Sequence, residues 1–89
     1  MPKLVITHAV EDLDRWLAGH AGRAEAIESA TGSNVTDFVA TDGSNNIAIT
    51  ADVGDVELLK GMLASPPPEV LEKMQEHGVL QPITAYIQA

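Results

Sequence analysis

The alternation of apolar and polar residues predicts four β-strands. The first is Lys3–Val10, which places Leu4, Ile6, His8 and Val10 on one face. Its other face is also apolar or small, which indicates that both sides are covered. The same pattern predicts three further strands, at residues 35–41, Asn46–Val53 and residues 81–88. Turn-forming residues at 42–45 separate the second and third strands, so these two are expected to form a hairpin.

A helical period over residues 12–30 predicts a helix after the first strand. Its apolar stripe comprises Leu13, Trp16, Leu17, His20, Ala24 and Ile27, and Asp12 or Glu11 can cap its start. Gly19 and Gly22 flank His20 and disfavour a regular helix, so we expect a bend or a close backbone approach there. Thr31 and Gly32 should end the helix, with Gly32 as a left-handed cap.

Two further helices are predicted between the third and last strands. Asp55 is placed to cap Val56–Ala64, and the proline run after Ser65 ends that helix. The next helix should begin at Pro67 or Pro68 and run to His77, with Gly78 as its cap.

This order of strands and helices predicts an α+β, ferredoxin-like βαββαβ fold with a four-stranded antiparallel sheet. Right-handed connections place the helices on one face of the sheet. The opposite face is too apolar to be left in water and carries Val5, Thr7, Phe38, Ala40, Ala48, Thr50 and Tyr86. We therefore expect a homodimer in which two copies pair through this face.

Size and charge narrow the classes of function. The 89 residues predict one domain, spanning 1–89. The net charge of −8, from 13 acidic and 5 basic residues, argues against binding to nucleic acid or to a membrane surface. The chain has no cysteine and no apolar run long enough to cross a membrane, so a cytoplasmic location is the expectation.

His8 and His20 are the candidate catalytic residues. Both should lie on the helix-covered side of the sheet, with Trp16 one helical turn before His20. Imidazole titrates near neutral pH, which suits a general base or a hydrogen-bond donor to a bound molecule. The alternative is a neutral structural histidine bonded to the backbone or to its partner histidine. Trp16 is either core or a pocket wall that stacks on a planar ligand; the remaining pocket candidates are Ile6, Met62, Met74 and Arg23.

Other polar residues have simpler interpretations. His77 ends a predicted helix, where the helix dipole favours its positive form, so capping is expected rather than catalysis. Arg23 could reach a ligand carboxylate or pair with Glu25 or Glu28. A metal site would need a third ligand beside the two histidines, and strand parity puts Asp52 on the opposite face from His8. We expect neither a metal nor a cofactor.

The chain resembles the dimeric α+β barrel superfamily, and within it small bacterial proteins related to antibiotic-biosynthesis monooxygenases. The resemblance covers nearly the whole sequence. It rests on the strand containing His8, residues 10–16 (VEDLDRW), His20, Arg23, Gly32, and residues 53–56 (VGDV), 63–66 (LASP) and 77–79 (HGV). It implies a homodimer with a ligand pocket in each subunit between sheet and helices, but no single reaction.

The preferred interpretation is a small homodimer that binds a small, largely apolar or aromatic molecule between sheet and helices. One alternative is a cofactor-independent monooxygenase or isomerase of secondary metabolism. Another is a structural or stress-related interaction module without a ligand. A pocket lined by His8, Trp16 and His20 would favour the first two, and a solidly packed layer would favour the third.

Overall fold

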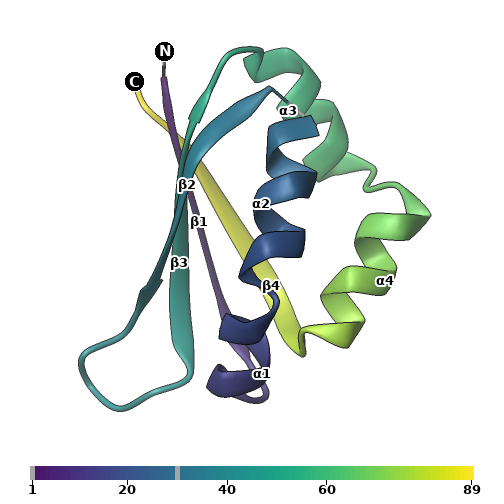
Figure 1. The fold of residues 1–89 in the computed structure, drawn as a ribbon. Helices are drawn as coiled ribbons and strands as arrows, with labels where there is room; N and C mark the ends of the chain where they lie inside the picture. The colour runs from purple at the N-terminus through teal and green to yellow at the C-terminus, as the bar shows by residue number, and fades with distance from the viewer. Residues whose placement is uncertain (1, 30) are drawn as a thin grey trace.

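The fold consists of four strands and four helices in a computed structural model, which describes residues 2–29 and 31–89 (Figure 1). In chain order the elements are β1 (Lys3–Val10), α1 (Leu13–Ala18), α2 (His20–Ser29), β2 (Gly32–Val39), β3 (Asn46–Val53), α3 (Val56–Ala64), α4 (Pro68–Glu76) and β4 (Val79–Ile87). β1, β3 and α3 have the predicted bounds.

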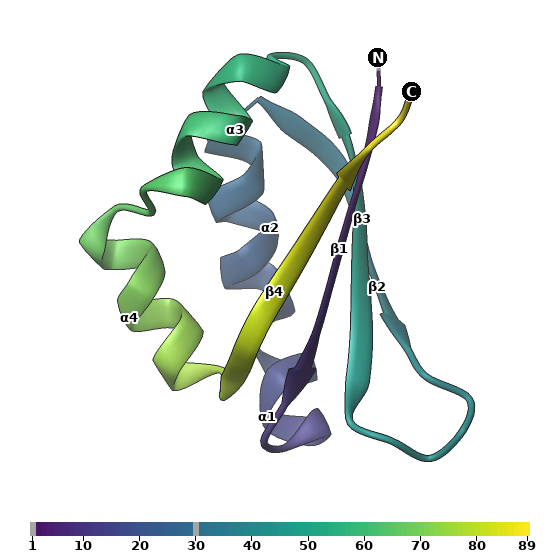
Figure 2. The ribbon, with the colours of Figure 1, turned by 180° about the vertical axis from the view of Figure 1, so that it is seen from behind.

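The strands form one antiparallel sheet in the order β2-β3-β1-β4, so β1 is central although it comes first in the chain. All four helices lie on one side of this sheet, and within residues 2–29 and 31–89 no helix or strand covers the other side (Figures 1 and 2). The predicted ferredoxin-like α+β fold is confirmed.

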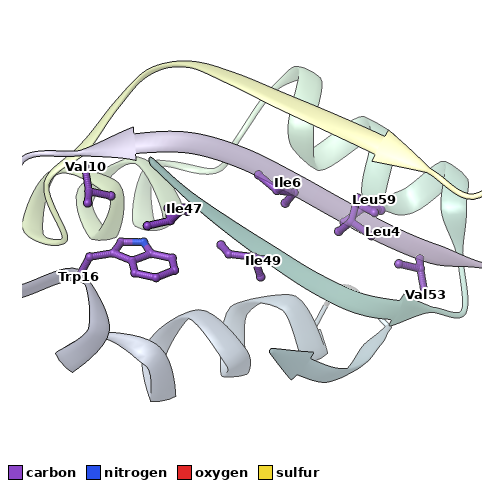
Figure 3. Close-up of a cluster of buried hydrophobic side chains, with 8 residues drawn as sticks. All are labelled: Leu4, Ile6, Val10, Trp16, Ile47, Ile49, Val53 and Leu59. Atoms are coloured by element: carbon purple, nitrogen blue, oxygen red, sulfur yellow. The ribbon is translucent and has the colours of Figure 1, made fainter. Parts of the chain in front are cut away.

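The core lies between the sheet and the helices. Alternate residues of β1 and β3 are buried against the helices, as the period of two predicted. The cluster of buried side chains in Figure 3 consists of Leu4, Ile6, Val10, Trp16, Ile47, Ile49, Val53 and Leu59. Trp16 is the only aromatic member of the cluster and is fully buried.

The predicted first helix is two helices, separated at Gly19. Asp12 caps α1 by accepting a hydrogen bond from the Arg15 backbone at 3.1 Å, as expected. At Gly19 a Cβ atom would come within 2.4 Å of the His77 imidazole. The glycine therefore allows α4 to approach closely, which confirms the expected irregularity. The predicted end of this helix at Ala30 lies outside the described residues.

Two strands have different limits from those predicted. β2 spans Gly32–Val39 rather than residues 35–41, and β4 begins at Val79 rather than at Gln81. Gly78 has the expected left-handed conformation, with φ of 71°. The left-handed cap expected at Gly32 is wrong, because Thr31 takes the positive φ, 66°, instead.

Gly32 is required for space rather than for its dihedral angles. A Cβ atom there would lie 2.3 Å from Ile27 Cγ2 and 2.9 Å from the Ile27 carbonyl oxygen. We expect Gly32→Ala to lower the free energy of unfolding by about 1–3 kcal/mol, because the end of α2 must shift. Urea denaturation measures the change.

Gly61→Ala is the matched control for that substitution. Gly61 lies within α3, and nothing lies within 4 Å of an added Cβ atom. Alanine is the better helix former, so the free energy of unfolding of this variant should rise by up to about 1 kcal/mol. Equal effects of the two substitutions would contradict the steric explanation.

The uncovered face of the sheet carries apolar residues interspersed with threonines. Its registers align two rows across the strands, Phe38–Ala48–Thr7–Thr84 and Thr36–Thr50–Val5–Tyr86. Phe38 and Tyr86 are 49% and 57% exposed. The residues predicted for this face from β1, β3 and β4 are therefore placed correctly, and no helix covers them (Figure 2).

Candidate functional site

His8 and Trp16 meet in the core, where β1 passes α1. Their ring centroids are 6.2 Å apart and the planes are nearly perpendicular, at 85°. His8 Nδ1 lies 2.9 Å from the Ala9 carbonyl oxygen, so Nδ1–H donates and Nε2 is left as an acceptor. Burial lowers the pKa of His8. The hydrogen bond to the Ala9 carbonyl raises the pKa and the positive charge of Arg23 lowers it further, but burial has the largest effect. His8 is therefore a neutral imidazole near physiological pH.

Arg23 lies over the indole of Trp16. Its guanidinium carbon is 3.9 Å from the ring centroid, which is a cation–π contact. Arg23 Nη1 also donates a hydrogen bond to the Trp16 carbonyl oxygen. Arg23 thus joins α2 to α1 across the break at Gly19.

Asp37 connects Arg23 to His20 and is the residue that the sequence analysis missed. Its Oδ2 accepts from His20 Nδ1 at 2.7 Å and from Arg23 Nη2 at 2.8 Å. The side chains of Asp37 and Arg23 are 9% and 10% exposed, whereas that of His20 is 46% exposed. The signal was present in the sequence, because Asp37 shares its strand face with Val35, which packs against the core.

The ion pair of Arg23 differs from the one suggested by the sequence. Its carboxylate partner is Asp37, from β2, and not Glu25 or Glu28 from its own helix. The buried Arg23 Nε and Asp37 Oδ1 have no hydrogen-bond partner. Nε and Nη2 lie on the same edge of a guanidinium group. A bond from Arg23 Nε to Asp37 Oδ1 would therefore complete a bidentate pair with the bond that Nη2 already makes to Oδ2. The buried Trp16 Nε1 also has no partner.

His77 closes this cluster from α4. The helix ends at Glu76, one residue before the predicted end, and His77 is its C-cap residue through its backbone N–H. The His77 Nδ1 lies 3.4 Å from Arg23 Nη1. The expectation that the helix end favours its positive form is wrong. Burial lowers the pKa of His77, and the positive charge of Arg23 lowers it further.

The predicted site residues are only partly brought together. His8, Trp16, Arg23 and His20 form a connected chain of contacts, with Asp37 as the link to His20. Ile6 belongs to the buried core, and Met62 packs against that core from α3. Met74 is half-buried on α4, and the contacts that join the histidines do not include it.

The structure has two surface hollows, one among the helices and one at the sheet. One, of about 250 Å³, lies between α2 and the α3–α4 pair and is lined by Glu25, Ala26, Ser29, Met62, Pro67, Glu69, Val70 and Lys73. The other, of about 290 Å³, lies where β1 meets β4 and is lined by Thr7, His8, Ala9, Asn46, Ile47, Gln81, Pro82 and Thr84. Trp16 and His20 line neither hollow, so the predicted pocket bounded by His8, Trp16 and His20 is not found, and His8 and Trp16 are packed in the core instead.

Within residues 2–29 and 31–89, no group of three or more His, Asp or Glu side chains is arranged to hold a metal ion. In the same part of the chain no helix is long and apolar enough to span a membrane.

Acidification should destabilise the protein through His8. Its folded pKa lies below the ordinary value of 6.5, so the unfolded chain binds the proton first. The contribution of His8 to stability is therefore complete above pH 6.5 and is lost as the pH falls through 6.5 towards the folded pKa. Urea denaturation at a series of pH values measures this loss. His8→Gln cannot titrate, and its stability should fall less steeply over that range; equal slopes would contradict the prediction.

Comparison with known proteins supports the fold. No protein-family model and no curated protein sequence matches the chain. Among solved structures, a "putative antibiotic biosynthesis monooxygenase" from Bordetella bronchiseptica superposes with a TM-score of 0.74 at 10% identity, over 99% of this chain and 94% of that one. The fold is shared with proteins of this kind. An antibiotic biosynthesis monooxygenase matches at a TM-score of 0.67 and 14% identity, over 100% and 97% of the two chains.

A third structure, Rv0793 from Mycobacterium tuberculosis, matches with a TM-score of 0.60 at 16% identity, over 100% of this chain and 94% of that one. At the level of the fold, these similarities confirm the resemblance noted from the sequence. Identities this low do not transfer an activity.

Proposed function

We propose that the protein is a cytoplasmic homodimer that binds a small, largely apolar or aromatic molecule among the helices that cover its sheet, rather than directly between sheet and helices as the sequence predicted. The observation that carries the proposal is the hollow between α2 and the α3–α4 pair. Its volume, about 250 Å³, is close to the lower end of the range for ligand sites, about 300 Å³.

The lining of this hollow has the composition of a ligand site. Its apolar part comes from Ala26, Met62, Pro67 and Val70, and methionine adapts its shape to what it contacts. Glu25, Glu69 and Lys73 supply charged groups around it. Lys73 Nζ has one contact to the Gly22 carbonyl oxygen, at 3.5 Å, and an ammonium group has three donors. An apolar molecule with one polar substituent fits this set.

The open face of the sheet supports the homodimer. Exposed Phe38, Tyr86 and Leu80 lie on it beside half-exposed Val5 and Ala48. Large exposed apolar side chains on an uncovered sheet face favour an interaction surface, and the same face of a second copy is its simplest complement.

N-phenyl-1-naphthylamine is a suitable probe, because it is apolar, uncharged and fluorescent only away from water. We expect a saturable rise in its fluorescence with the wild-type protein. Val70→Phe should fill the hollow and weaken binding about tenfold or more, since the probe and the new ring compete for the same volume.

Leu71→Phe is the matched control. Leu71 follows Val70 on α4 but is exposed and lies outside the hollow. This variant should bind the probe as the wild type does. Absence of saturable binding to the wild type, or equal loss in both variants with helical content unchanged, would contradict the proposed site.

The pair formed by His20 and Asp37 favours a second candidate, a cofactor-independent isomerase or monooxygenase. Asp37 holds His20 by Nδ1, which leaves Nε2 of a half-exposed imidazole free to accept a proton. Turnover of a bound molecule that His20→Gln abolishes, with binding retained, would distinguish catalysis from binding alone.

A further inference from the structure

The pairing of β1 with β4 is interrupted beside His8. Thr7 pairs with Thr84, but Ala9 pairs with Leu80, so one residue of β1 faces three residues of β4. Pro82 is in the middle of these three and has no N–H to give to the ladder. The extra residues displace β4 from β1. The hollow of about 290 Å³ lies at this interruption.

This hollow opens on the face of the sheet away from the helices. Thr7 and Ala9 lie on that face, since their neighbours Ile6, His8 and Val10 are buried on the other. Asn46 pairs with Ala9 and Thr84 pairs with Thr7, so their side chains share the open face. The site is thus separated by the thickness of the sheet from the one between the helices.

The lining of the hollow carries no carboxylate, ammonium or guanidinium group. Its polar residues are His8, whose imidazole is neutral, Thr7 and Thr84 with their hydroxyls, and Asn46 and Gln81 with their amides. Ala9, Ile47 and Pro82 give it apolar walls. Hydroxyls and amides both donate and accept, so they suit a partner with hydroxyl or carbonyl groups and without formal charge.

We infer that this hollow is a second binding site, for a neutral, single-ring molecule bearing hydroxyl or carbonyl groups. The volume of about 290 Å³ limits the occupant to roughly one small substituted ring. Exposed Phe38, Leu80 and Tyr86 share the open face, so a second copy docked there covers the mouth of the hollow. This covering rests on the proposed homodimer; the hollow itself does not.

Resorcinol, a neutral ring with two hydroxyls, is the probe, and amide chemical shifts of the ¹⁵N-labelled full chain are the readout. We expect saturable shifts at Thr7, Ala9, Gln81 and Thr84, with Val70 and Lys73 unmoved. Thr84→Val removes one hydroxyl without changing the shape of the side chain. It should weaken binding about five-fold, since one hydrogen bond is lost.

Thr50→Val is the matched control. Thr50 lies on the same face in the neighbouring row and outside the hollow, so affinity should be unchanged. Shifts centred elsewhere, no saturation, or equal losses in both variants would overturn the site.

Tyr86→Asp tests the contribution of the second copy. Tyr86 is on the open face and outside the hollow. This variant should be a monomer by light scattering and should bind resorcinol more weakly than the wild type. A monomeric wild type that still binds resorcinol at Thr84 would refute the homodimer and the covering, and would leave the site itself supported.

Discussion

Trp16→Ala should remove about 3–5 kcal/mol of the free energy of unfolding, the range for truncating a large buried aromatic residue. Trp16 is fully buried and occupies the space between the edge of His8 and the guanidinium of Arg23. No other aromatic residue belongs to the core cluster, so no large neighbour can fill the space left behind. The total free energy of unfolding of a native protein is about 5–15 kcal/mol, so this variant should be close to unfolding at 37 °C.

The measurement is urea denaturation followed by circular dichroism, at one protein concentration because dimerisation contributes to stability. Leu17→Ala is the control from the same helix, since Leu17 is exposed where Trp16 is buried. Leu17→Ala should lower the free energy of unfolding by less than about 1 kcal/mol. A loss of similar size in both variants would show that α1, and not the indole, is what the substitution damages.

Arg23→Met should have the second largest effect, about 3–5 kcal/mol, because it leaves the carboxylate of Asp37 buried without its cation. Methionine keeps most of the apolar part of the Arg23 side chain. The loss of stability should therefore come mainly from the missing positive charge. The bond from His20 remains, but His20 is half-exposed and carries a full charge only when protonated.

The double variant Arg23→Met, Asp37→Leu tests this explanation. Removing both charges should recover most of the stability, since a buried ion pair gains little over an apolar pair of similar shape. Lys60→Met is the control for an exposed pair. Lys60 and Glu57 are 3.8 Å apart on the surface of α3, and breaking their contact should cost less than about 0.5 kcal/mol. A double variant as unstable as Arg23→Met would contradict the charge argument.

Most of the fold was predictable because its information is local. The period of two in β1 and β3, the caps at Asp12 and Asp55 and the glycine at 78 each act within a few residues of chain. The break at Gly19 was predictable as an irregularity but not in its cause. The His77 ring that requires the glycine comes from a helix more than fifty residues later.

The candidate site was less predictable because its charges pair across elements. His8 and Trp16 could be placed together by parity and helical period alone. The partner of Arg23 could not, since acidic residues on its own helix were closer in sequence than Asp37. The pKa of His77 was misjudged for the same reason. The dipole of its own helix was visible in the sequence, whereas the burial and the facing Arg23 were not.

The central position of β1 has a consequence for the growing chain. β1 is the first strand made, yet it pairs on one side with β3 and on the other with β4, and Gln88 donates its backbone N–H to the Lys3 carbonyl oxygen. A nascent chain that has emerged only as far as β3 therefore presents β1 as a bare strand edge. Such an edge invites pairing with another polypeptide. The exposed edge of β1 is closed only when β4 has been made and pairs with it.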